Sequence, residues 1–174
     1  MNQDQIFDEL LILKCREGDT KAFELLVKRW SKKLIFFAYK FTNNIEAARD
    51  VTQESWISIH KGLRKLQEPS KFKSWAFRIT HNKSIDYLRQ QKKQELAEIE
   101  PVIEDDLDND QWPTVNALLL NMPKQHKTVL TLFYLEQQSI RQIASILKLS
   151  EGTVKSRIFY AREHLKRKYK EVKL

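Results

Sequence analysis

The sequence predicts an all-α protein with two small helical domains joined by a flexible acidic linker. The 174 residues include only 3 Gly and 4 Pro, which leaves few turns. Apolar residues recur at three- and four-residue steps over most of the chain, as in amphipathic helices. The charge changes sign at residues 92–112, which hold eight acidic and two basic residues between two basic segments. The expected domains are therefore residues 1–91 and residues 113–174, and the acidic stretch is the linker.

Two helices are expected at the start of the chain. Apolar residues between Ile6 and Leu13 predict a short helix that ends near Gly18. Thr20 is expected to cap the next helix, whose apolar stripe is broad enough for packing on more than one side. The polar run 42–44 is expected to end that helix.

Two further helices complete the predicted first domain. One runs over about residues 45–66. Residues 66–70 are expected to form a loop because Pro69 disfavours helix before it, and Ser70 is expected to cap the fourth helix. That helix runs over about residues 71–91, so that four helices make a compact, bundle-like domain.

The second domain is expected to begin with two helices. Pro113 and Pro123 flank the first of them, which carries Val115, Leu118 and Leu119. The next one runs over about residues 125–135. Both precede the segment 139–174.

The end of the chain has the pattern of a helix-turn-helix. Ser139 and Gln142 form an S-x-x-Q capping box, which predicts a helix that begins there. Residues 148–150 break the apolar pattern, and Ser150 is well placed to cap the last helix. Two short helices joined by a tight turn, the second of them basic, are typical of this DNA-binding motif.

The last helix is predicted to have two different faces. At about 100° per residue, its apolar side holds Val154, Ile158, Ala161 and Leu165. The other side holds Gly152, Ser156, Phe159, Tyr160 and Glu163, with Lys155 and Arg162 on its flank. Outward aromatic and basic side chains suit a DNA groove better than plain solvent. A hairpin that only packs a core is the alternative, but residues 113–174 hold 12 basic and 4 acidic residues, which argues against it.

The composition favours a polyanionic partner and a reducing compartment. The formal charge is +8 and the isoelectric point is near 9.5. Cys15 is the only cysteine, so an intrachain disulfide is impossible. The N-terminus is unlike a signal peptide, and the longest apolar run, residues 34–39, is far short of a membrane span. We therefore expect a soluble, cytoplasmic protein.

Catalytic, metal-binding and cofactor-binding patterns are absent from the sequence. Asp106-x-Asp108-x-Asp110 resembles the start of a calcium loop, but Gln111 and Ala117 stand where that loop needs Gly and Glu. The four histidines lack the spacing of zinc ligands, and three glycines are too few for a phosphate-binding loop. We expect no catalytic residue, metal, cofactor or small-molecule substrate.

Three stretches resemble one known family. Residues 48–56 (ARDVTQESW) resemble the A-x-D-x-x-Q-E-x-aromatic signature of bacterial sigma factors. Residues 72–89 (FKSWAFRITHNKSIDYLR) resemble their F-x-x-W-x-x-x-I-x-x-N-x-x-x-D-x-x-R helix. Residues 152–157 (GTVKSR) are similar to the G-T-V-(K/R)-S-R recognition helix of the family. The order, spacing and two-domain length resemble those of the extracytoplasmic-function (ECF) subfamily of sigma-70 factors.

The resemblance implies a subunit that gives RNA polymerase core its promoter specificity. The first domain would bind core and melt the −10 element, and the second would read the −35 element. In the family, the helix that matches Asp50, Gln53 and Glu54 docks on the clamp helices of the largest polymerase subunit. These residues lie at i, i+3 and i+4 and form one polar edge, although a merely solvated face has the same pattern.

The resemblance also assigns residues to the single-stranded −10 element. Asn82 matches a position of the pocket that holds a flipped base, where an amide reads the base edge. The cations expected to meet phosphates there are Lys71, Lys73, Arg78 and Lys83. Phe72 and Trp75 are interpreted as packing residues because their spacing is that of a buried stripe. A buried structural amide stays open as the alternative for Asn82.

The contacts expected at the double-stranded −35 element lie on the last helix: Thr153, Lys155, Ser156, Phe159, Tyr160 and Arg162. Ser156 would bond a base or phosphate, and Phe159 would touch thymine methyls. Lys155 and Arg162 would grip phosphates, which fixes register without specifying sequence. The family often has Arg or another long polar residue at the place of Tyr160, so the promoter sequence stays open.

Further features of the family concern its regulation. The linker resembles one that is threaded through the polymerase active-site cleft and RNA exit path, but a solubilising tether fits equally well. The family usually has a membrane-tethered anti-sigma factor, so such a partner is expected. Two other interpretations stay open: a free-standing helix-turn-helix repressor or activator, which would dimerise on duplex DNA, and a nucleic-acid-processing enzyme, for which the sequence offers no positive sign.

Overall fold

The chain forms two helical units. The computed structural model describes the backbone of residues 3–95 and 122–172 and the side chains of residues 3–92 and 122–167. Every regular element within these ranges is helical, which confirms the predicted all-α class. No helix in these ranges is both long enough and apolar enough to cross a membrane. Most of the predicted linker and the predicted first helix of the second domain lie outside the described residues.

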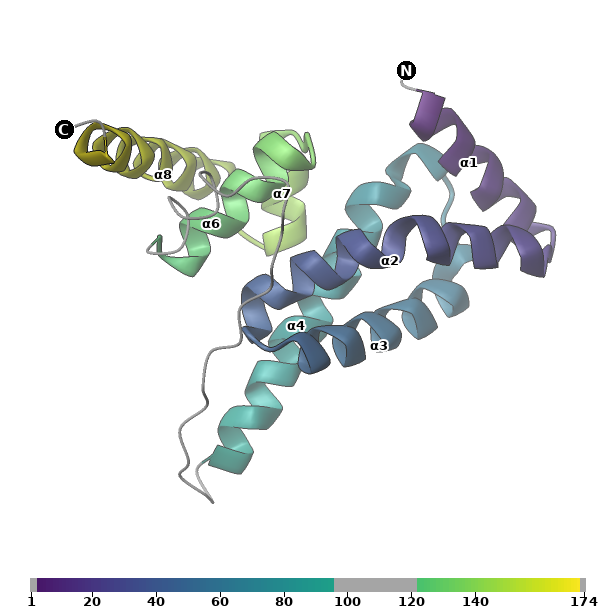
Figure 1. Cartoon of the computed structure of the whole chain (residues 1–174). Coiled ribbons are helices and arrows are strands. Elements are labelled where there is room, and N and C mark those ends of the chain that lie inside the picture. The colour runs from purple at the N-terminus through teal and green to yellow at the C-terminus, as the bar shows by residue number, and fades with distance from the viewer. Residues whose placement is uncertain (1–2, 96–121, 173–174) are drawn as a thin grey trace. The chain divides into compact units, whose positions relative to one another are not determined.

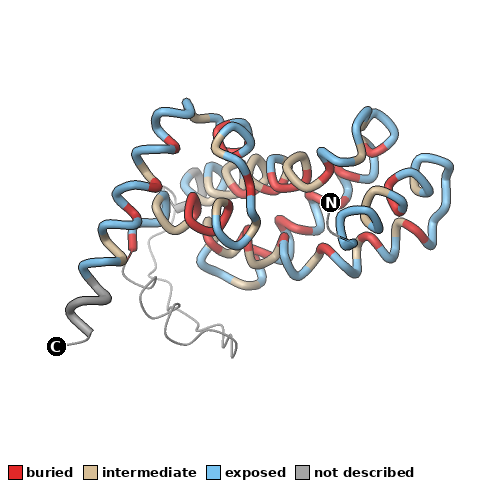
Figure 2. Tube along the Cα trace, turned by 90° about the horizontal axis from the view of Figure 1, so that it is seen from above, coloured by how far each residue is buried: buried red, intermediate tan, exposed pale blue. Residues whose placement is uncertain are grey.

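The described part of the first unit contains four α-helices. They are α1 (Gln3–Arg16), α2 (Thr20–Thr42), α3 (Ile45–Leu63) and α4 (Phe72–Glu95), and a 3-10 turn, η1 (Pro69–Lys71), precedes α4. α2 and α3 lie side by side, and α4 packs against both (Figure 1). Buried residues line the sides on which these helices face one another (Figure 2).

Aromatic side chains fix α4 against α2. The Trp30 ring meets the Phe72 ring edge to face, with the centroids 5.3 Å apart. The Phe37 and Phe77 rings meet in the same way at 4.9 Å. Each such pair contributes about 0.5–1.5 kcal/mol beyond the burial of its area. Because these rings occupy the inner side of α4, the opposite side of that helix faces outward.

The observed helix ends correct four predictions. Asp19, rather than Thr20, caps α2, because its carboxylate accepts the N–H of Ala22 at 3.1 Å. α3 ends at Leu63, earlier than predicted, since the chain turns tightly through i→i−3 bonds just after it. Ser70 lies inside η1 and does not cap α4. α4 continues to Glu95, so residues 92–95 of the predicted linker are helical; the domain limits themselves stay predictions.

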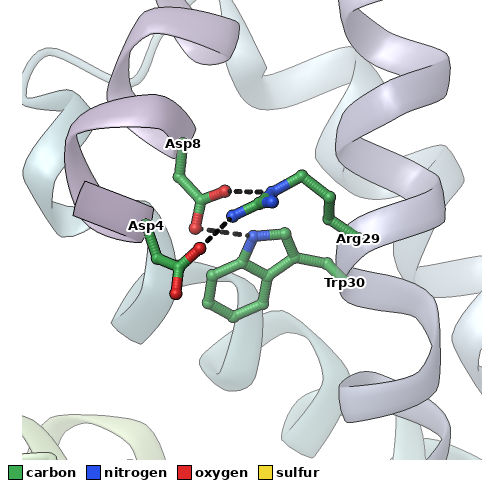
Figure 3. A network of polar contacts seen from close by, with 4 residues as sticks. All are labelled: Asp4, Asp8, Arg29 and Trp30. Atoms are coloured by element: carbon green, nitrogen blue, oxygen red, sulfur yellow. Dashed lines mark hydrogen bonds and ion pairs between the residues drawn. The ribbon is translucent and has the colours of Figure 1, made fainter. Parts of the chain in front are cut away.

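A polar network fastens α1 to α2 (Figure 3). The Asp8 carboxylate accepts from Arg29 Nε at 2.9 Å and from Trp30 Nε1 at 3.1 Å. The Asp4 carboxylate accepts from the Arg29 guanidinium at 3.0 Å. The hydrogen bonds that Arg29 donates to these carboxylates, above all to Asp8 and then to Asp4, raise the pKa of Arg29. Since Trp30 also packs on Phe72, the network ties the N-terminal helix to the core that holds α4.

The described part of the second unit contains α6 (Lys124–Leu130), η2 (Thr131–Leu135), α7 (Ile140–Leu147) and α8 (Glu151–Val172). α6 and α7 both pack against α8. η2 is a turn of π-helix, closed by a bond from the Glu136 N–H to the Thr131 carbonyl at 2.9 Å. The predicted helix over 125–135 is therefore α-helical only in its first part.

The predicted helix-turn-helix is confirmed down to its caps. The Gln142 N–H donates to Ser139 Oγ at 3.2 Å, and the Ser139 N–H donates to Gln142 Oε1 at 2.8 Å. Lys148 has a φ of 55°, a left-handed conformation that ends α7. The Thr153 N–H then donates to Ser150 Oγ at 3.1 Å, which caps α8.

Candidate nucleic-acid interface

The two faces of α8 agree with their sequence pattern. Val154, Ile158 and Ala161 are buried against the rest of the unit. Phe159 and Tyr160, by contrast, are 59% and 61% exposed, and their rings meet edge to face at 5.5 Å. Two large aromatic rings held together in solvent are typical of a surface that binds a partner.

The polar residues of this face differ in how far they are engaged. Ser156 Oγ donates to the Gly152 carbonyl at 3.1 Å, so it is turned back on its own helix. Thr153 Oγ1 lies 2.9 Å from Ser150 Oγ. Lys155 is exposed and makes no ion pair with any residue in the described part of the chain. Its ammonium group is thus available to a phosphate.

Arg162 has neighbours that the sequence did not predict. Its guanidinium carbon lies 5.7 Å from the centre of the Phe133 ring and 5.4 Å from the centre of the Tyr134 ring. Both rings belong to η2. Apolar spacing could not reveal this contact, because a π-helical turn does not follow the α-helical period.

On α4, three of the residues singled out in the sequence form one outward stripe. Trp75, Arg78 and Asn82 follow one another at i, i+3 and i+7, so they share one side of the helix, about 100° or more around it from the buried Phe77. Arg78 is exposed, whereas Trp75 and Asn82 are half-buried. A ring, a guanidinium and an amide on one face can stack on a base, bind a phosphate and read a base edge.

The environments of Trp75 and Asn82 differ. A Cβ on Gly62 would lie 2.8 Å from Cζ2 of Trp75, so the missing side chain of that glycine lets the indole pack against α3. Phe72 is fully inside the core. The Asn82 amide makes no hydrogen bond to any described residue and is not among the fully buried, unpartnered polar atoms. Asn82 is thus not a fully buried amide, and its role at the −10 element stays a prediction.

The remaining cations of the predicted −10 set differ from Arg78 in pairing or in position. Lys71 Nζ pairs with the Glu68 carboxylate at 2.6 Å. Lys83 Nζ pairs with the Glu54 carboxylate of α3 at 3.2 Å. Lys73, half-buried, lies about 140° around the helix from Arg78. The ion pair of Lys83 joins two sites that the sequence assigned to different partners.

The polar edge of α3 is exposed as predicted. Asp50, Gln53 and Glu54 all lie on the surface of the first unit. Ile57, which follows Gln53 by one turn, is 48% exposed on the same face. The sequence pattern alone did not single out Ile57, because an isolated exposed isoleucine gives no periodic signal.

Groups that could support catalysis are scattered. No cluster of three or more His, Cys, Asp or Glu side chains in the described ranges could hold a metal ion. Burial and the nearby Asp19 raise the pKa of Cys15 to about 11, so its thiol is unreactive near neutral pH. Burial, followed by the positive charges of Arg157 and His164, lowers the pKa of His126.

Comparison with known proteins identifies two family domains in the chain. The Sigma-70 region 2 family matches residues 26–94, and the Sigma-70 region 4 family matches residues 114–165. The ECF RNA polymerase sigma-E factor of Haemophilus influenzae is 30% identical over an alignment that covers 95% of this chain and 96% of that protein. The ECF sigma factor SigW of Bacillus subtilis is 26% identical, with 92% and 96% covered.

Solved structures give the same result. CnrH, determined in complex with the cytosolic domain of CnrY, is similar with a TM-score of 0.65 and 26% identity, covering 95% of this chain and 98% of that one. The sigma factor RpoE of Bartonella quintana, in complex with the anti-sigma factor NepR, shares the fold with a TM-score of 0.73 at 20% identity, covering 87% and 98%. Sigma factors are non-enzymatic subunits that bind RNA polymerase core and promoter DNA. The chain belongs to the ECF subfamily of the sigma-70 family and directs promoter-specific initiation of transcription.

Proposed function

We propose that the two units divide promoter opening between them through the residues of α3, α4 and α8. The first unit docks on core and holds the single-stranded −10 element, and the second grips the −35 duplex. One observation carries this proposal. The predicted contact residues of α3 and α8 are exposed to solvent, while the apolar residues that stand between them along each helix, such as Val51 and Val154, are buried. Such faces have room for a partner without any rearrangement of the core.

Core docking is assigned to the polar edge of α3. Asp50, Gln53 and Glu54 offer two carboxylates and an amide to basic and polar groups of the clamp helices. Ile57 adds an exposed apolar side chain on the same face. An apolar contact surrounded by polar groups is the usual composition of a protein interface.

Binding of the −10 strand is assigned to the stripe of α4. Asn82 reads the edge of a flipped base, and the exposed side of Trp75 offers a stacking surface beside it. Arg78 meets the phosphate backbone, as do Lys71 and Lys83 once their acidic partners have moved. Lys73 contacts the same phosphate backbone from the flank of the helix.

Binding of the −35 element is assigned to α8. Lys155 and Arg162 bind phosphates and set the register, while Phe159 and Tyr160 enter the major groove. The hydroxyls of Thr153 and Ser156 must leave their present partners before they can meet DNA.

An anti-sigma factor is a further proposed partner. The likeness to CnrH, whose structure holds the cytosolic domain of CnrY, supports this proposal. The protein would then act in the cytoplasm with polymerase, and an anti-sigma factor anchored in the membrane would retain it there when inactive.

The experiment that tests this division is permanganate footprinting of unpaired thymines on a promoter, with purified core and either the wild type or a variant. Asn82→Ala is expected to abolish opening at −10 while nuclease protection at −35 persists. Lys155→Ala is expected to weaken protection at −35. Equal loss of both signals in both variants would contradict the division of roles.

A further inference from the structure

The contact between Arg162 and η2 gives a role to a residue outside the predicted DNA-binding set. Tyr134 is 52% exposed, too open to be a core residue, and its ring lies edge to face on Phe133 with the centroids 5.0 Å apart. The exposed guanidinium of Arg162 rests against both rings, at 5.4 Å from Tyr134 and 5.7 Å from Phe133.

The π-helical turn makes this arrangement possible. Neighbouring residues of an α-helix point about 100° apart, so two successive side chains rarely contact one group. η2 closes with an i→i−5 bond from Glu136 to Thr131, and its extra residue changes the directions of the side chains around it. π-helical turns of this kind occur frequently at functional sites.

The guanidinium keeps its binding capacity in this contact. A cation–π contact uses no N–H donor, so the donors that point away from the rings remain available for a phosphate. Arg162 follows Lys155 by seven residues, so the two cations lie on one side of α8, about 10 Å apart along its axis. Both can thus contact the backbone of one DNA duplex.

We propose that Tyr134 is a positioning residue for DNA binding: its ring holds the Arg162 guanidinium in place for a backbone phosphate of the −35 duplex. A long arginine side chain that is already held loses less rotamer freedom on binding than a mobile one. Tyr134 acts through Arg162 and does not touch the DNA. The inference rests on the proposed −35 role of α8.

The test is a double-mutant cycle on duplex binding by the full chain. The probe is a fluorescent duplex that carries the upstream element of a promoter transcribed by core with this protein, titrated between about 50 and about 200 mM salt. Tyr134→Leu is expected to weaken binding roughly two- to fivefold, the range for an exposed cation–π contact. Tyr134→Phe, which keeps the ring, is expected to bind like the wild type.

Arg162→Met provides the background that shows whether Tyr134 acts through Arg162 or independently of it. It is expected to reduce the slope of log affinity against log salt by about 0.9, the value for one duplex phosphate. In that background, Tyr134→Leu is expected to have no further effect. The same loss in both backgrounds would overturn the proposal, because Tyr134 would then act independently of Arg162, and so would wild-type affinity of Tyr134→Leu.

Two controls distinguish failure of the Tyr134 proposal from a folding defect and from failure of the −35 assignment. Thermal unfolding followed by circular dichroism shows whether Tyr134→Leu destabilises the second unit. If it does, Arg162→Lys replaces it in the test, since it keeps the charge without the planar group; it is expected to keep the salt slope but lose affinity two- to fivefold. An unchanged affinity of Arg162→Lys would also overturn the proposal. Failure of the wild type to bind any such duplex would contradict the −35 assignment itself.

Discussion

The two candidate DNA-binding surfaces differ in how their cations are engaged. In the first unit, Lys71 is paired with Glu68 and Lys83 with Glu54. In the second unit, Lys155 makes no ion pair with a described residue, and Arg162 rests on aromatic rings rather than on a carboxylate. The surface of α8 is therefore ready for phosphate, whereas these two lysines of the first unit must first leave an acidic partner.

If the proposed assignments hold, the Glu54–Lys83 ion pair predicts a link between DNA binding by the first unit and core binding. Glu54 belongs to the polar edge assigned to core, and Lys83 belongs to the −10 set. A core group that binds the Glu54 carboxylate competes with Lys83 for it. We therefore expect the first unit to hold single-stranded DNA more tightly in the holoenzyme than alone, and the second unit to gain less from core.

The largest effect is expected from reversing the charge at Glu54. Glu54→Lys should weaken binding to purified core about tenfold or more, because a carboxylate in the interface is replaced by a cation. Binding is measured by fluorescence anisotropy, with circular dichroism to verify the fold. The matched control is Glu24→Lys, the same charge change on an exposed residue of α2. Affinity for core that stays equal to that of the control would contradict the docking assignment.

A smaller effect is expected from removing the unpaired cation of α8. Lys155→Ala should weaken promoter binding by the holoenzyme several-fold and reduce the salt slope by about 0.9, since one phosphate contact is lost. Lys28→Ala, an exposed lysine on α2, removes the same charge elsewhere and should leave the slope unchanged. Equal slopes for the wild type and Lys155→Ala would mean that Lys155 does not contact DNA.

A modest effect is expected from the Glu54–Lys83 pair, because exposed ion pairs contribute only about 0–1 kcal/mol. Glu54→Gln should raise the affinity of the free protein for a −10 single strand by up to about fivefold. The gain should vanish in a Lys83→Met background. Asp50→Asn, which removes the same charge from α3 without breaking this pair, is the control. A gain of equal size in Asp50→Asn would show a general charge effect and not release of Lys83.

The smallest effect is expected from a fall in pH, through His126 of the second unit. The pKa of His126 is lowered in the folded protein by burial and by Arg157 and His164. A base of this kind contributes stability above its unfolded pKa of about 6.5 and loses that contribution as the pH falls below it. The Tm of the wild type should fall below about pH 6.5 more steeply than that of His126→Gln. Parallel Tm profiles in circular dichroism would exclude this source of pH dependence.

Features fixed by short-range chemistry could be predicted from the sequence. The capping box of Ser139 and Gln142, the Ser150 cap and the buried stripe of α8 each depend on residues only a few positions apart. The choice of Thr20 over Asp19 was wrong because two adjacent residues were both suitable caps. The set Asp50–Gln53–Glu54 came from the family resemblance, whereas helical periodicity already placed Lys155, Phe159 and Tyr160 on the outward side of the last helix. The roles of both sets stay predictions.

Features that depend on packing between helices could not be predicted. The Glu54–Lys83 pair joins residues 29 positions apart, and the contact of Arg162 with Tyr134 depends on a π-helical turn. The packing of Trp75 on Gly62 likewise requires α3 and α4 to be in place. Periodicity indicates which side of a helix faces inward, but not which neighbour lies there.

The sigma-factor role is tested most directly by transcription with purified bacterial core polymerase on genomic fragments of the source organism, with and without this protein. We expect transcripts that need both components and start downstream of paired −35 and −10 elements. Transcription that does not depend on the protein, together with tight binding of duplex DNA by the protein alone, would instead support a free-standing repressor and contradict the sigma-factor role.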